Sequence, residues 1–421
     1  MALAFDPLAP EWRDDPYPTY RRLRDEAPVH HSPERGIYSV TRCEDVTRAL
    51  NNPQTFSSRA MFTMLMNGGS EELPPLSWEV LRFITSMVFR ARLNPRTFAT
   101  ARNLIAEDGE AHASMRAIVN RGFTPRRIAA WEDRARQLVD ECLAGLRRGE
   151  PFDVVADLAV PLPTTIIAEL LGIEPARRAD FKRWSNMVVD VATGPGREDR
   201  FAARYRKTFV ELIRYLRSIA RQRRREPKDD VISSIVAEQE GATGLDDREV
   251  VQFVMLLLVA GNETTTNWIG NATGALLDHP EALHRVAANP GLVPAALEEA
   301  LRFDSPVQVV FRNTTEETEL AGVALPKGAY VALFLGSANR DERRFAEPDR
   351  FDLDRDSRGH LGFGFGHHFC LGASLARLEA RAALEALAPE LPKLERVSAE
   401  VPRVDSFLVR GASRLPLRRA A

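Results

Sequence analysis

The sequence predicts a mainly helical protein with small β-sheets, and three observations support this fold class. Apolar residues recur at helical spacing over long stretches of the chain. Runs of β-branched residues bounded by turn formers are short and few. Neither an internal repeat nor a Gly/Ser linker divides the sequence. A length of 421 residues would ordinarily favour two or three domains, but the continuous pattern leads us to expect a single domain over residues 1–421.

Helical periodicity is strongest in five segments, which in chain order are residues 127–148, 205–225, 246–278, 294–303 and 372–388. Strands are expected at residues 37–41, 318–320 and 330–335. The apolar run between Gln252 and Asn262 is too short to cross a bilayer, so we interpret the 246–278 segment as a buried core helix.

Composition excludes several classes of function. The chain has 57 basic and 59 acidic residues and a net charge of -2, which gives no indication of a nucleic-acid partner. Charge and proline follow the N-terminus too early for a signal peptide or membrane anchor, so we expect a cytoplasmic protein. The cysteines, Cys43, Cys142 and Cys370, lack the paired spacing of a disulfide framework or a zinc site. Any role for cysteine is expected to be that of a single thiolate.

The most specific motif is FGFGHHFCLG, from Phe363 to Gly372. Its glycines, with Gly362 before them, permit a tight backbone turn, and Cys370 stands where this loop enters an apolar helix. Backbone N–H groups and the positive end of the helix dipole favour a thiolate there, which is the form of cysteine that binds iron. The alternative is that Cys370 is a small buried hydrophobe.

This motif resembles the haem-binding loop of the cytochrome P-450 family, Phe-Gly-x-Gly-x-His-x-Cys-x-Gly, at every specified position. The resemblance is to soluble bacterial members and implies that Cys370 is the axial ligand of haem b iron, with Phe363 packed near the sulfur. Electron donation by such a thiolate promotes cleavage of the oxygen–oxygen bond. The implied architecture is the cytochrome P-450 fold, with the haem buried between the long 246–278 helix and the Cys370 loop.

A second motif begins with Glu299 and Arg302, which stand three residues apart and can meet on one face of a helix. Such a pair is often only a solvated salt bridge. Together with the later Arg350, the motif resembles the family's Glu-x-x-Arg element. The resemblance implies that Glu299, Arg302 and Arg350 form a structural triad behind the haem.

A third motif, AGNETT, lies in the middle of the long helix. Its threonines could simply bond back to carbonyls and bend the helix. The motif also resembles the family's Ala-Gly-x-(Asp/Glu)-Thr-(Thr/Ser) element, which implies that the helix widens at Ala260 and Gly261 beside the haem to admit dioxygen. Glu263 is then the proton conduit, and Thr264 is the hydroxyl that orders the water delivering protons.

Haem propionates require cationic or hydrogen-bonding partners inside a protein. The resemblance assigns this role to His112, Arg116, Arg312 and His368. The chain departs from many bacterial members between His112 and Arg116, where Ser114 stands in place of a second arginine.

The segment from residue 57 to residue 104 is rich in Met and Phe and is interrupted by Gly and Pro pairs. Its apolar side chains could cover a neighbouring helix. As a group they suit an adaptable pocket, and we expect the segment to act as a lid that closes on substrate. Phe62 and Met66 of this segment are candidates for contact with substrate. Further candidates fall at positions where relatives line the pocket, namely Leu256, Val259, Ala260, Val307, Val309, Val310 and Phe407.

The function implied by this resemblance is a monooxygenase that inserts one atom of O2 into a lipophilic small molecule, such as a terpenoid, steroid, fatty acid or polyketide. We expect a monomer that takes electrons from a separate ferredoxin and ferredoxin reductase, with the ferredoxin docking near Arg116, Arg343, Arg344 and Arg377. One alternative is a peroxide-driven peroxygenase, a class in which Arg and Pro typically replace the acid and threonine. The others are a non-catalytic haem-binding sensor and a helical binding protein without a cofactor.

Overall fold

The computed structural model describes residues 5–12, 14–61, 77–94, 101–192, 202–237 and 244–420, and the structural statements below refer to these residues. They form two compact units, each built from separated segments. Unit 1 contains Met1–Ser57, Ile128–Pro163 and Glu263–Ala421, and unit 2 contains Ser58–Arg127 and Thr164–Asn262. Three helices carry the chain from one unit to the other, namely α7 (Pro125–Ala129), α9 (Pro161–Leu170) and α13 (Asp247–Asp278). The expected single domain stays a prediction.

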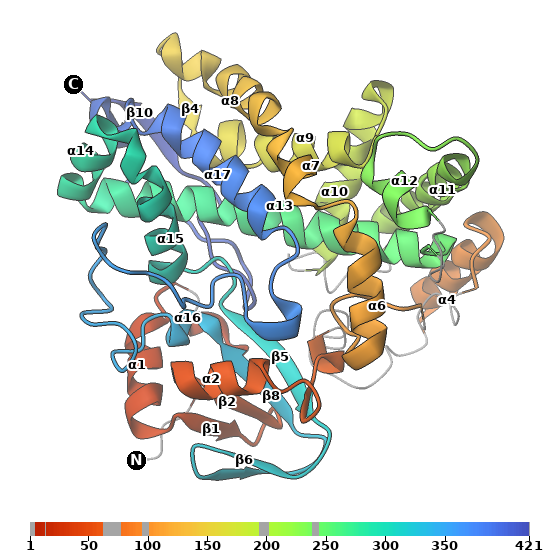
Figure 1. Ribbon diagram of the computed structural model, residues 1–421, viewed down its shortest axis with the longest axis horizontal. Helices are drawn as coiled ribbons and strands as arrows, with labels where there is room; N and C mark the ends of the chain where they lie inside the picture. The colour runs from red at the N-terminus through yellow and green to blue at the C-terminus, as the bar shows by residue number, and fades with distance from the viewer. Residues whose placement is uncertain are drawn as a thin grey trace. The chain divides into compact units, whose positions relative to one another are not determined.

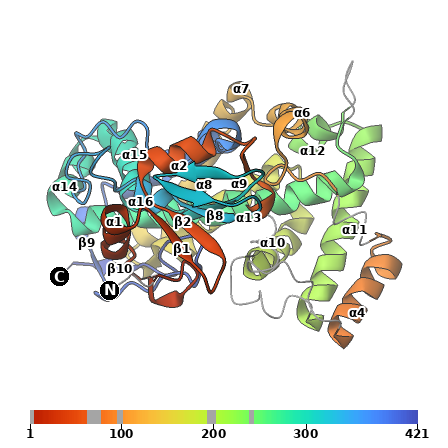
Figure 2. The ribbon, with the colours of Figure 1, turned by 90° about the horizontal axis from the view of Figure 1, so that it is seen from below.

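Unit 1 contains a five-stranded sheet with the order β1-β2-β8-β5-β3, in which β2 and β8 are parallel and the other pairs antiparallel. Helix α2 (Cys43–Leu50) lies across this sheet (Figures 1 and 2), where Val46 and Leu50 pack in one apolar cluster with Val40 and Leu333 of the strands. The five strands are β1 (Val29–Ser32), β2 (Ile37–Val40), β3 (Phe56–Ser57), β5 (Val309–Thr314) and β8 (Tyr330–Phe334).

Two smaller sheets complete the β-structure of unit 1. One has the order β4-β10-β9 and the other is the hairpin β6-β7. Their strands are β4 (Phe152–Asp153), β6 (Thr318–Leu320), β7 (Val323–Leu325), β9 (Leu394–Arg396) and β10 (Pro416–Arg419).

The helices of unit 1 include α8 and α17, which run side by side (Figure 1). Ion pairs join them, because Arg381 of α17 lies 3.0 Å from Glu132 of α8 and Arg136 of α8 lies 2.9 Å from Glu385. The α-helices are α1 (Tyr17–Glu26), α2, α8 (Glu132–Arg147), α14 (Pro280–Ala288), α15 (Val293–Phe303), α16 (Leu335–Ala338) and α17 (Ala373–Leu387). Short turns of other helix types are η1 (Pro10–Trp12), η3 (Val154–Ala159), η6 (Pro290–Leu292), η7 (Gly366–His368) and η8 (Leu391–Lys393).

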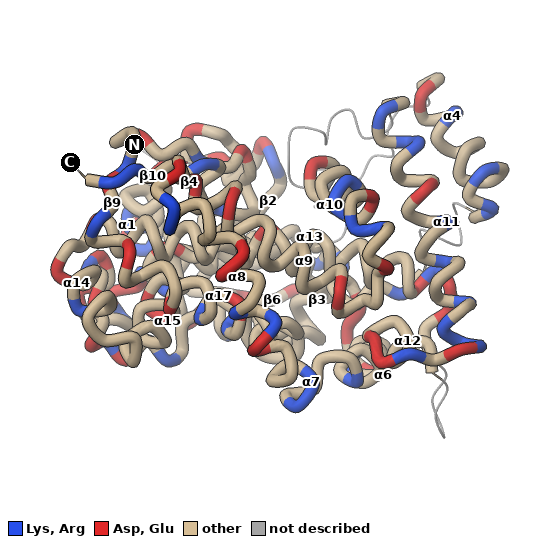
Figure 3. Tube along the Cα trace, turned by 90° about the horizontal axis from the view of Figure 1, so that it is seen from above, with Lys and Arg blue, Asp and Glu red and all other residues tan. Residues whose placement is uncertain are grey.

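The regular secondary structure of unit 2 is helical in its described residues, with turns and loops between the helices. Its longest complete helix, α11 (Ala203–Arg225), contacts α10, α12 and η2, and basic residues recur along it (Figure 3). The buried Arg223 donates to Asp230 at 2.5 Å and ties α11 to the start of α12. The other elements are α4 (Trp78–Thr85), η2 (Ser86–Arg90), α6 (Gly109–Asn120), η4 (Pro175–Arg177), α10 (Arg178–Ala192) and α12 (Val231–Val236).

The predicted fold class, mainly helical with small sheets, is confirmed. The predicted helices and strands lie within a few residues of α11, α13, α15, α17, β2, β6 and β8. The 127–148 segment differs, because α7 ends at Ala129 and α8 starts at Glu132. Glu132 and Asp133 fill the first turn of α8, where acidic side chains favour a new helix start. Among the described helices, none combines the length and apolar character needed to cross a bilayer.

A buried ion pair on α15 organises the long connection that leads to the Cys370 loop. Arg302 donates to Glu299 through Nε at 2.8 Å and through Nη2 at 2.7 Å, and both side chains are almost fully buried. The remaining Arg302 donors bind backbone carbonyls of the connection, those of Asn339, Pro348 and Arg350, at 2.8–3.1 Å. Two charges are thus satisfied in the interior, and the connection is held against α15.

The prediction that the Arg350 side chain completes the triad with Glu299 and Arg302 was wrong. The Arg350 side chain is 63% exposed and pairs with Glu347 at 3.5 Å, so only its carbonyl joins the network. Arg355 takes the predicted place, because its Nε donates to Glu299 at 3.1 Å and its side chain is 10% exposed. The chain turns at Pro348–Asp349, and Arg355, five residues after Arg350, then contacts the Glu299 carboxylate.

We predict that Glu299→Gln lowers the free energy of unfolding by about 3–5 kcal/mol, because it leaves two buried guanidinium groups without their shared carboxylate. Urea unfolding of the purified protein, followed by far-ultraviolet circular dichroism, measures the change. The control is Glu347→Gln, which removes a carboxylate that is 75% exposed and is expected to change stability by no more than about 0.5 kcal/mol. Equal stability of the two variants would contradict the structural role of Glu299.

Candidate functional site

The Cys370 loop in unit 1 is closed by a backbone hydrogen bond and two left-handed glycines. The Cys370 N–H donates to the Phe363 carbonyl at 2.9 Å. Gly364 and Gly366 have φ values of 71° and 70°, a conformation that L side chains rarely adopt. A Cβ atom on Gly366 would also lie 3.0 Å from the Leu50 carbonyl oxygen. Backbone conformation therefore requires glycine at 364 and 366, and close packing adds a second reason at Gly366.

Cys370 occupies the last part of this loop, two residues before the N-cap of α17. Its side chain is partly exposed and is not in a disulfide, whereas Cys43 is buried. Aromatic rings surround the loop, because Phe363 lies 6.2 Å from Phe369, and Phe369 is itself 41% exposed. The loop thus presents a thiol and an apolar aromatic surface together, at the start of a helix that favours negative charge.

Beside the loop lies a charged cluster that the sequence analysis did not find. Glu298 of α15 accepts from Arg377 of α17 at 2.7 Å and 2.9 Å and lies 3.0 Å from His360 Nε2. Burial opposes the ionisation of Glu298, but the hydrogen bonds from Arg377 and His360 outweigh burial and lower the pKa of Glu298 from 4.5 to about 2. Arg377 also stacks over Phe363, 4.4 Å from the ring centroid. The cluster therefore joins α15 and α17 to the loop that carries Cys370.

One face of α13 is partly exposed although most of the helix is buried. Leu256, Val259, Ala260, Glu263 and Thr264 are each intermediate or exposed, and their spacing of i, i+3, i+4, i+7 and i+8 places them on a single face. This set is hereafter the open face of α13. It combines an apolar surface with one carboxyl and one hydroxyl group.

Contacts of α13 with neighbouring elements explain why the motif contains a small residue and an amide. A Cβ atom on Gly261 would lie 2.7 Å from Cδ1 of Ile167, so packing against α9 requires glycine. Asn262 donates to Ser185 at 2.5 Å, and Thr266 donates to the Ala159 carbonyl at 2.8 Å. The helix continues without interruption through this point, so the widening implied by the motif is not visible as a break in α13.

Trp268 connects the open face of α13 to the Cys370 loop. It follows Thr264 by one helical turn, and its ring lies 5.5 Å from Phe363 in an edge-on arrangement. The Trp268 Nε1 donates to the Leu297 carbonyl at 3.0 Å, which fixes the ring. The structure therefore brings Thr264 within about one turn, roughly 6 Å along the helix, of the contact with the Cys370 loop, and Glu263 is one residue further away.

The residues proposed to hold propionates fall in both units. In unit 1, Arg312 is buried on β5 and donates to the Phe311 carbonyl at 2.8 Å, and His368 is partly exposed in η7. In unit 2, His112 and Arg116 lie one turn apart on α6, where His112 is buried and Arg116 partly exposed. Their role towards a ligand stays a prediction.

The substrate-contacting candidates differ in their surroundings. Val307 and Val310 pack against the apolar cluster beneath α2, whereas Val309 alternates to the other face of β5. Phe407 is partly exposed and lies 6.0 Å from Phe311. Leu256 and Val259 belong to the open face of α13. Phe62 and Met66 lie outside the described residues.

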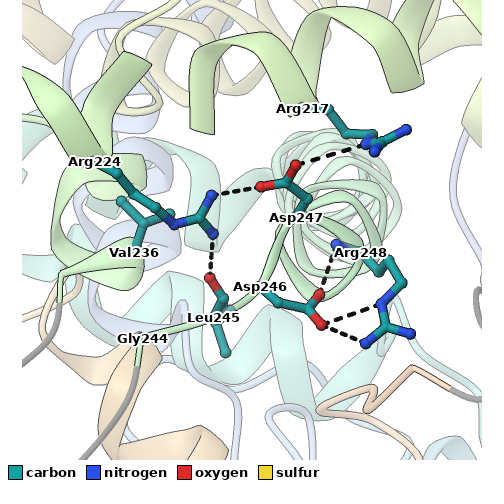
Figure 4. A pocket seen from close by; sticks show the side chains of 8 residues that line it. All are labelled: Arg217, Arg224, Val236, Gly244, Leu245, Asp246, Asp247 and Arg248. Carbon is teal, nitrogen blue, oxygen red and sulfur yellow. Dashed lines mark hydrogen bonds and ion pairs between the residues drawn. The ribbon is translucent and has the colours of Figure 1, made fainter. Parts of the chain in front are cut away.

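A cavity of about 450 Å³ in unit 2 contains none of the predicted site residues (Figure 4). It lies at the start of α13, where Asp247 faces Arg217 and Arg224 of α11. Asp246 pairs with Arg248 at 2.6 Å. Because both aspartates are paired with arginines, we interpret the cavity as a joint that anchors the N-terminus of α13 to α11.

Comparison with known proteins agrees with the loop and helix geometry. The cytochrome P-450 family matches residues 83–388 of the chain. Vitamin D(3) 25-hydroxylase of Pseudonocardia autotrophica is 37% identical over 412 residues, which cover 96% of this chain and 94% of that protein. The chain therefore belongs to the cytochrome P-450 family, and it is a monooxygenase that uses haem b.

Solved structures support the same fold over nearly the whole chain. CYP109Q5 from Chondromyces apiculatus has a TM-score of 0.84 and 39% identity, covering 99% of this chain and 98% of that one. CYP109E1 from Bacillus megaterium, solved in complex with corticosterone, has a TM-score of 0.82 and 32% identity, covering 98% of this chain and 100% of that one.

The residues present suit a haem. A partly exposed thiol with aromatic rings beside it offers an axial ligand and an apolar surface for a flat macrocycle. The open face of α13 includes Ala260, whose small side chain is exposed in an otherwise buried helix, and this suits close approach of a planar group. When bound, the haem supplies the activation of dioxygen.

Proposed function

We propose that this monooxygenase hydroxylates a steroid-like lipophilic molecule, with Cys370 as the proximal thiolate and the open face of α13 as the distal side of the site. The observation that carries the proposal is the open face itself. It places apolar side chains next to Glu263 and Thr264, and Trp268 ties the following turn to the loop that carries Cys370. A single helix, α13, thus offers both an apolar surface for a lipophilic substrate and the pair Glu263 and Thr264 for proton delivery.

Glu263 and Thr264 are the residues that we propose for proton delivery. Oxygen activation consumes two protons, so a carboxyl group that exchanges protons with solvent and an adjacent hydroxyl that orders a water molecule meet the need. Both side chains are partly exposed on the same face, which keeps them within reach of water and of a substrate. Their presence favours an enzyme that uses O2 and external electrons over a peroxide-driven peroxygenase or a sensor, neither of which requires a proton relay.

Steroid-like molecules are the substrate class that the relatives favour among those expected from the sequence. One relative is named as a hydroxylase of vitamin D(3), and a structural neighbour was solved with corticosterone. Rigid polycyclic substrates of this kind bind through apolar contact and few polar groups. The apolar side chains of Leu256 and Val259 on the open face of α13 provide such contacts.

The segment containing α4 and η2 is proposed to close on the bound substrate. Trp78 is 69% exposed and Phe89 76% exposed, although Phe83 packs 5.5 Å from Phe209 of α11. Large apolar side chains that face solvent gain free energy when a lipophilic molecule covers them. A lid that closes in this way also excludes water from the reacting site.

We further propose that a cytoplasmic ferredoxin and its reductase supply electrons to a monomeric enzyme. Arg343 and Arg344 are exposed, and an acidic ferredoxin would be attracted to them. Arg343 is already shared among Asp25, Asp341 and Glu342, whereas the hydrogen bond of Arg344 is to the Arg358 carbonyl. Arg344 therefore retains the larger uncompensated charge of the two and is the better docking residue.

The test of the thiolate assignment is spectroscopic. The reduced carbon-monoxide complex of the purified protein is expected to show the red-shifted Soret band of thiolate ligation, and Cys370→Ala should abolish it because no other residue replaces the sulfur. Cys142→Ala is the matched control, since this partly exposed cysteine on α8 should be dispensable. A normal band in Cys370→Ala, or a wild-type protein that takes up no haem, would overturn the proposal.

For the substrate class, we predict that a steroid such as corticosterone shifts the ferric Soret band towards the high-spin form by displacing water. A long-chain fatty acid is the comparison ligand and is expected to require at least tenfold higher concentration, because a flexible chain loses more conformational entropy on binding. Optical titration of both ligands gives the two dissociation constants. Tighter binding of the fatty acid would exclude the steroid assignment while leaving the monooxygenase class intact.

Thr264→Ala is expected to retain haem and substrate binding but to lower product formation roughly 100-fold, with electrons diverted to hydrogen peroxide. Parallel assays of electron consumption, product and peroxide measure this coupling. The control, Thr266→Ala, removes a buried hydroxyl that donates to the Ala159 carbonyl, so it should cost about 1 kcal/mol of stability without changing coupling. Unchanged coupling in Thr264→Ala would remove this hydroxyl from the mechanism.

A further inference from the structure

The Glu298–Arg377 pair lies beside the Cys370 loop but belongs to none of the motifs that define the site. Arg377 stands seven residues after Cys370, on the second turn of α17, and its guanidinium lies 4.4 Å from the Phe363 ring centroid. Nε and Nη2 of Arg377 both donate to Glu298, at 2.7 Å and 2.9 Å. This two-point contact fixes the plane and position of the positive charge.

Glu298 is fixed in turn by the start of the Cys370 loop. The Gly362 N–H donates to His360 Nδ1 at 3.0 Å, so Nε2 carries the proton of a neutral ring and donates to Glu298 at 3.0 Å. His360 is largely buried, with 6% of its side chain exposed. The pair is therefore held from α15, α17 and the loop, unlike a flexible surface salt bridge.

The positive charge of Arg377 acts on the Cys370 sulfur. The hydrogen bond with Glu298 raises the pKa of Arg377 most strongly, burial opposes this, and the charges of Glu298 and Cys370 raise it further. Electrostatic interaction is mutual, so the guanidinium stabilises negative charge on the sulfur. The carboxylate of Glu298, which binds the guanidinium, offsets part of that field.

We propose that Glu298 and Arg377 are positioning residues that set the reduction potential of the iron bound at Cys370 from opposite directions. This inference rests on the proposed role of Cys370 as the thiolate ligand. Reduction adds one electron from an external donor to ferric iron and gives ferrous iron, without making or breaking a bond to the protein. The added negative charge is stabilised by Arg377 and destabilised by Glu298, so Arg377 raises the potential and Glu298 lowers it.

The experiment compares single substitutions in the haem-loaded protein. Arg377→Leu should shift the midpoint potential to more negative values, and Glu298→Gln, which keeps the side-chain shape, should shift it to more positive values. The double variant Glu298→Gln/Arg377→Leu should return towards the wild-type potential. Redox titration with dithionite and small mediators measures the potential directly, so a lost ferredoxin contact does not affect it.

Arg381→Leu is the matched control. Arg381 lies one turn further along α17, has 39% of its side chain exposed compared with 42% for Arg377, and pairs with Glu132 of α8 at 3.0 Å. Its removal breaks an ion pair of an equally exposed arginine on the same helix but leaves the environment of Cys370 intact, so the potential should stay at the wild-type value. If Arg377→Leu retains too little haem to titrate, Arg377→Lys with Glu298→Gln keeps the positive charge and is expected to shift the potential to more positive values.

Opposite shifts from Arg377→Leu and Glu298→Gln support the inference, because a merely structural role would move both potentials in the same direction or release haem from both variants. Shifts of the same sign, or unchanged potentials in variants whose carbon-monoxide complexes keep the thiolate Soret band, would overturn it. Absence of that band from the wild-type protein is a different result, since it overturns the role of Cys370 itself.

Discussion

The buried ion pair between Glu299 and Arg302 is the constraint on which the rest of unit 1 depends. Neither charge has access to water, so each must be satisfied by groups that the chain brings to it. Those groups are carbonyls from residues 339–350 and donors from residues 352–357. The need to satisfy two buried charges thus folds a long, irregular connection into one conformation. Asn339 continues the same network, because its Oδ1 accepts from Leu361 N at 2.6 Å, directly before the Cys370 loop.

Two neighbouring glutamates on α15 consequently perform different tasks. Glu299 faces the connection and binds Arg302 and Arg355, whereas Glu298 faces α17 and binds Arg377. Adjacent residues on a helix point about 100° apart, so one short segment of α15 reaches both the connection and α17. The first carboxylate is a structural support. The second holds Arg377, whose guanidinium packs on Phe363 of the Cys370 loop.

In α13, too, different faces of the helix have different roles. Gly261, Asn262 and Thr266 are committed to packing and hydrogen bonds with neighbouring elements, and this commitment orients the open face with its carboxyl and hydroxyl groups. Trp268 then fixes one end of that face against Phe363. These contacts hold the helix in place and give Glu263 and Thr264 a defined position, which proton delivery requires.

The sequence by itself determined the family, the mainly helical fold and the residues with distinctive local chemistry. Cys370, Gly364, Gly366, Glu299 and Arg302 could be recognised because their motifs are short and their spacing reflects local backbone geometry. Only the tertiary structure decided which distant side chains complete these motifs. Arg355 rather than Arg350 reaches Glu299, and His360 and Arg377 converge on Glu298, because irregular turns without periodicity bring them there. Local spacing carries no information about such turns, so contacts across them follow from the folded chain alone.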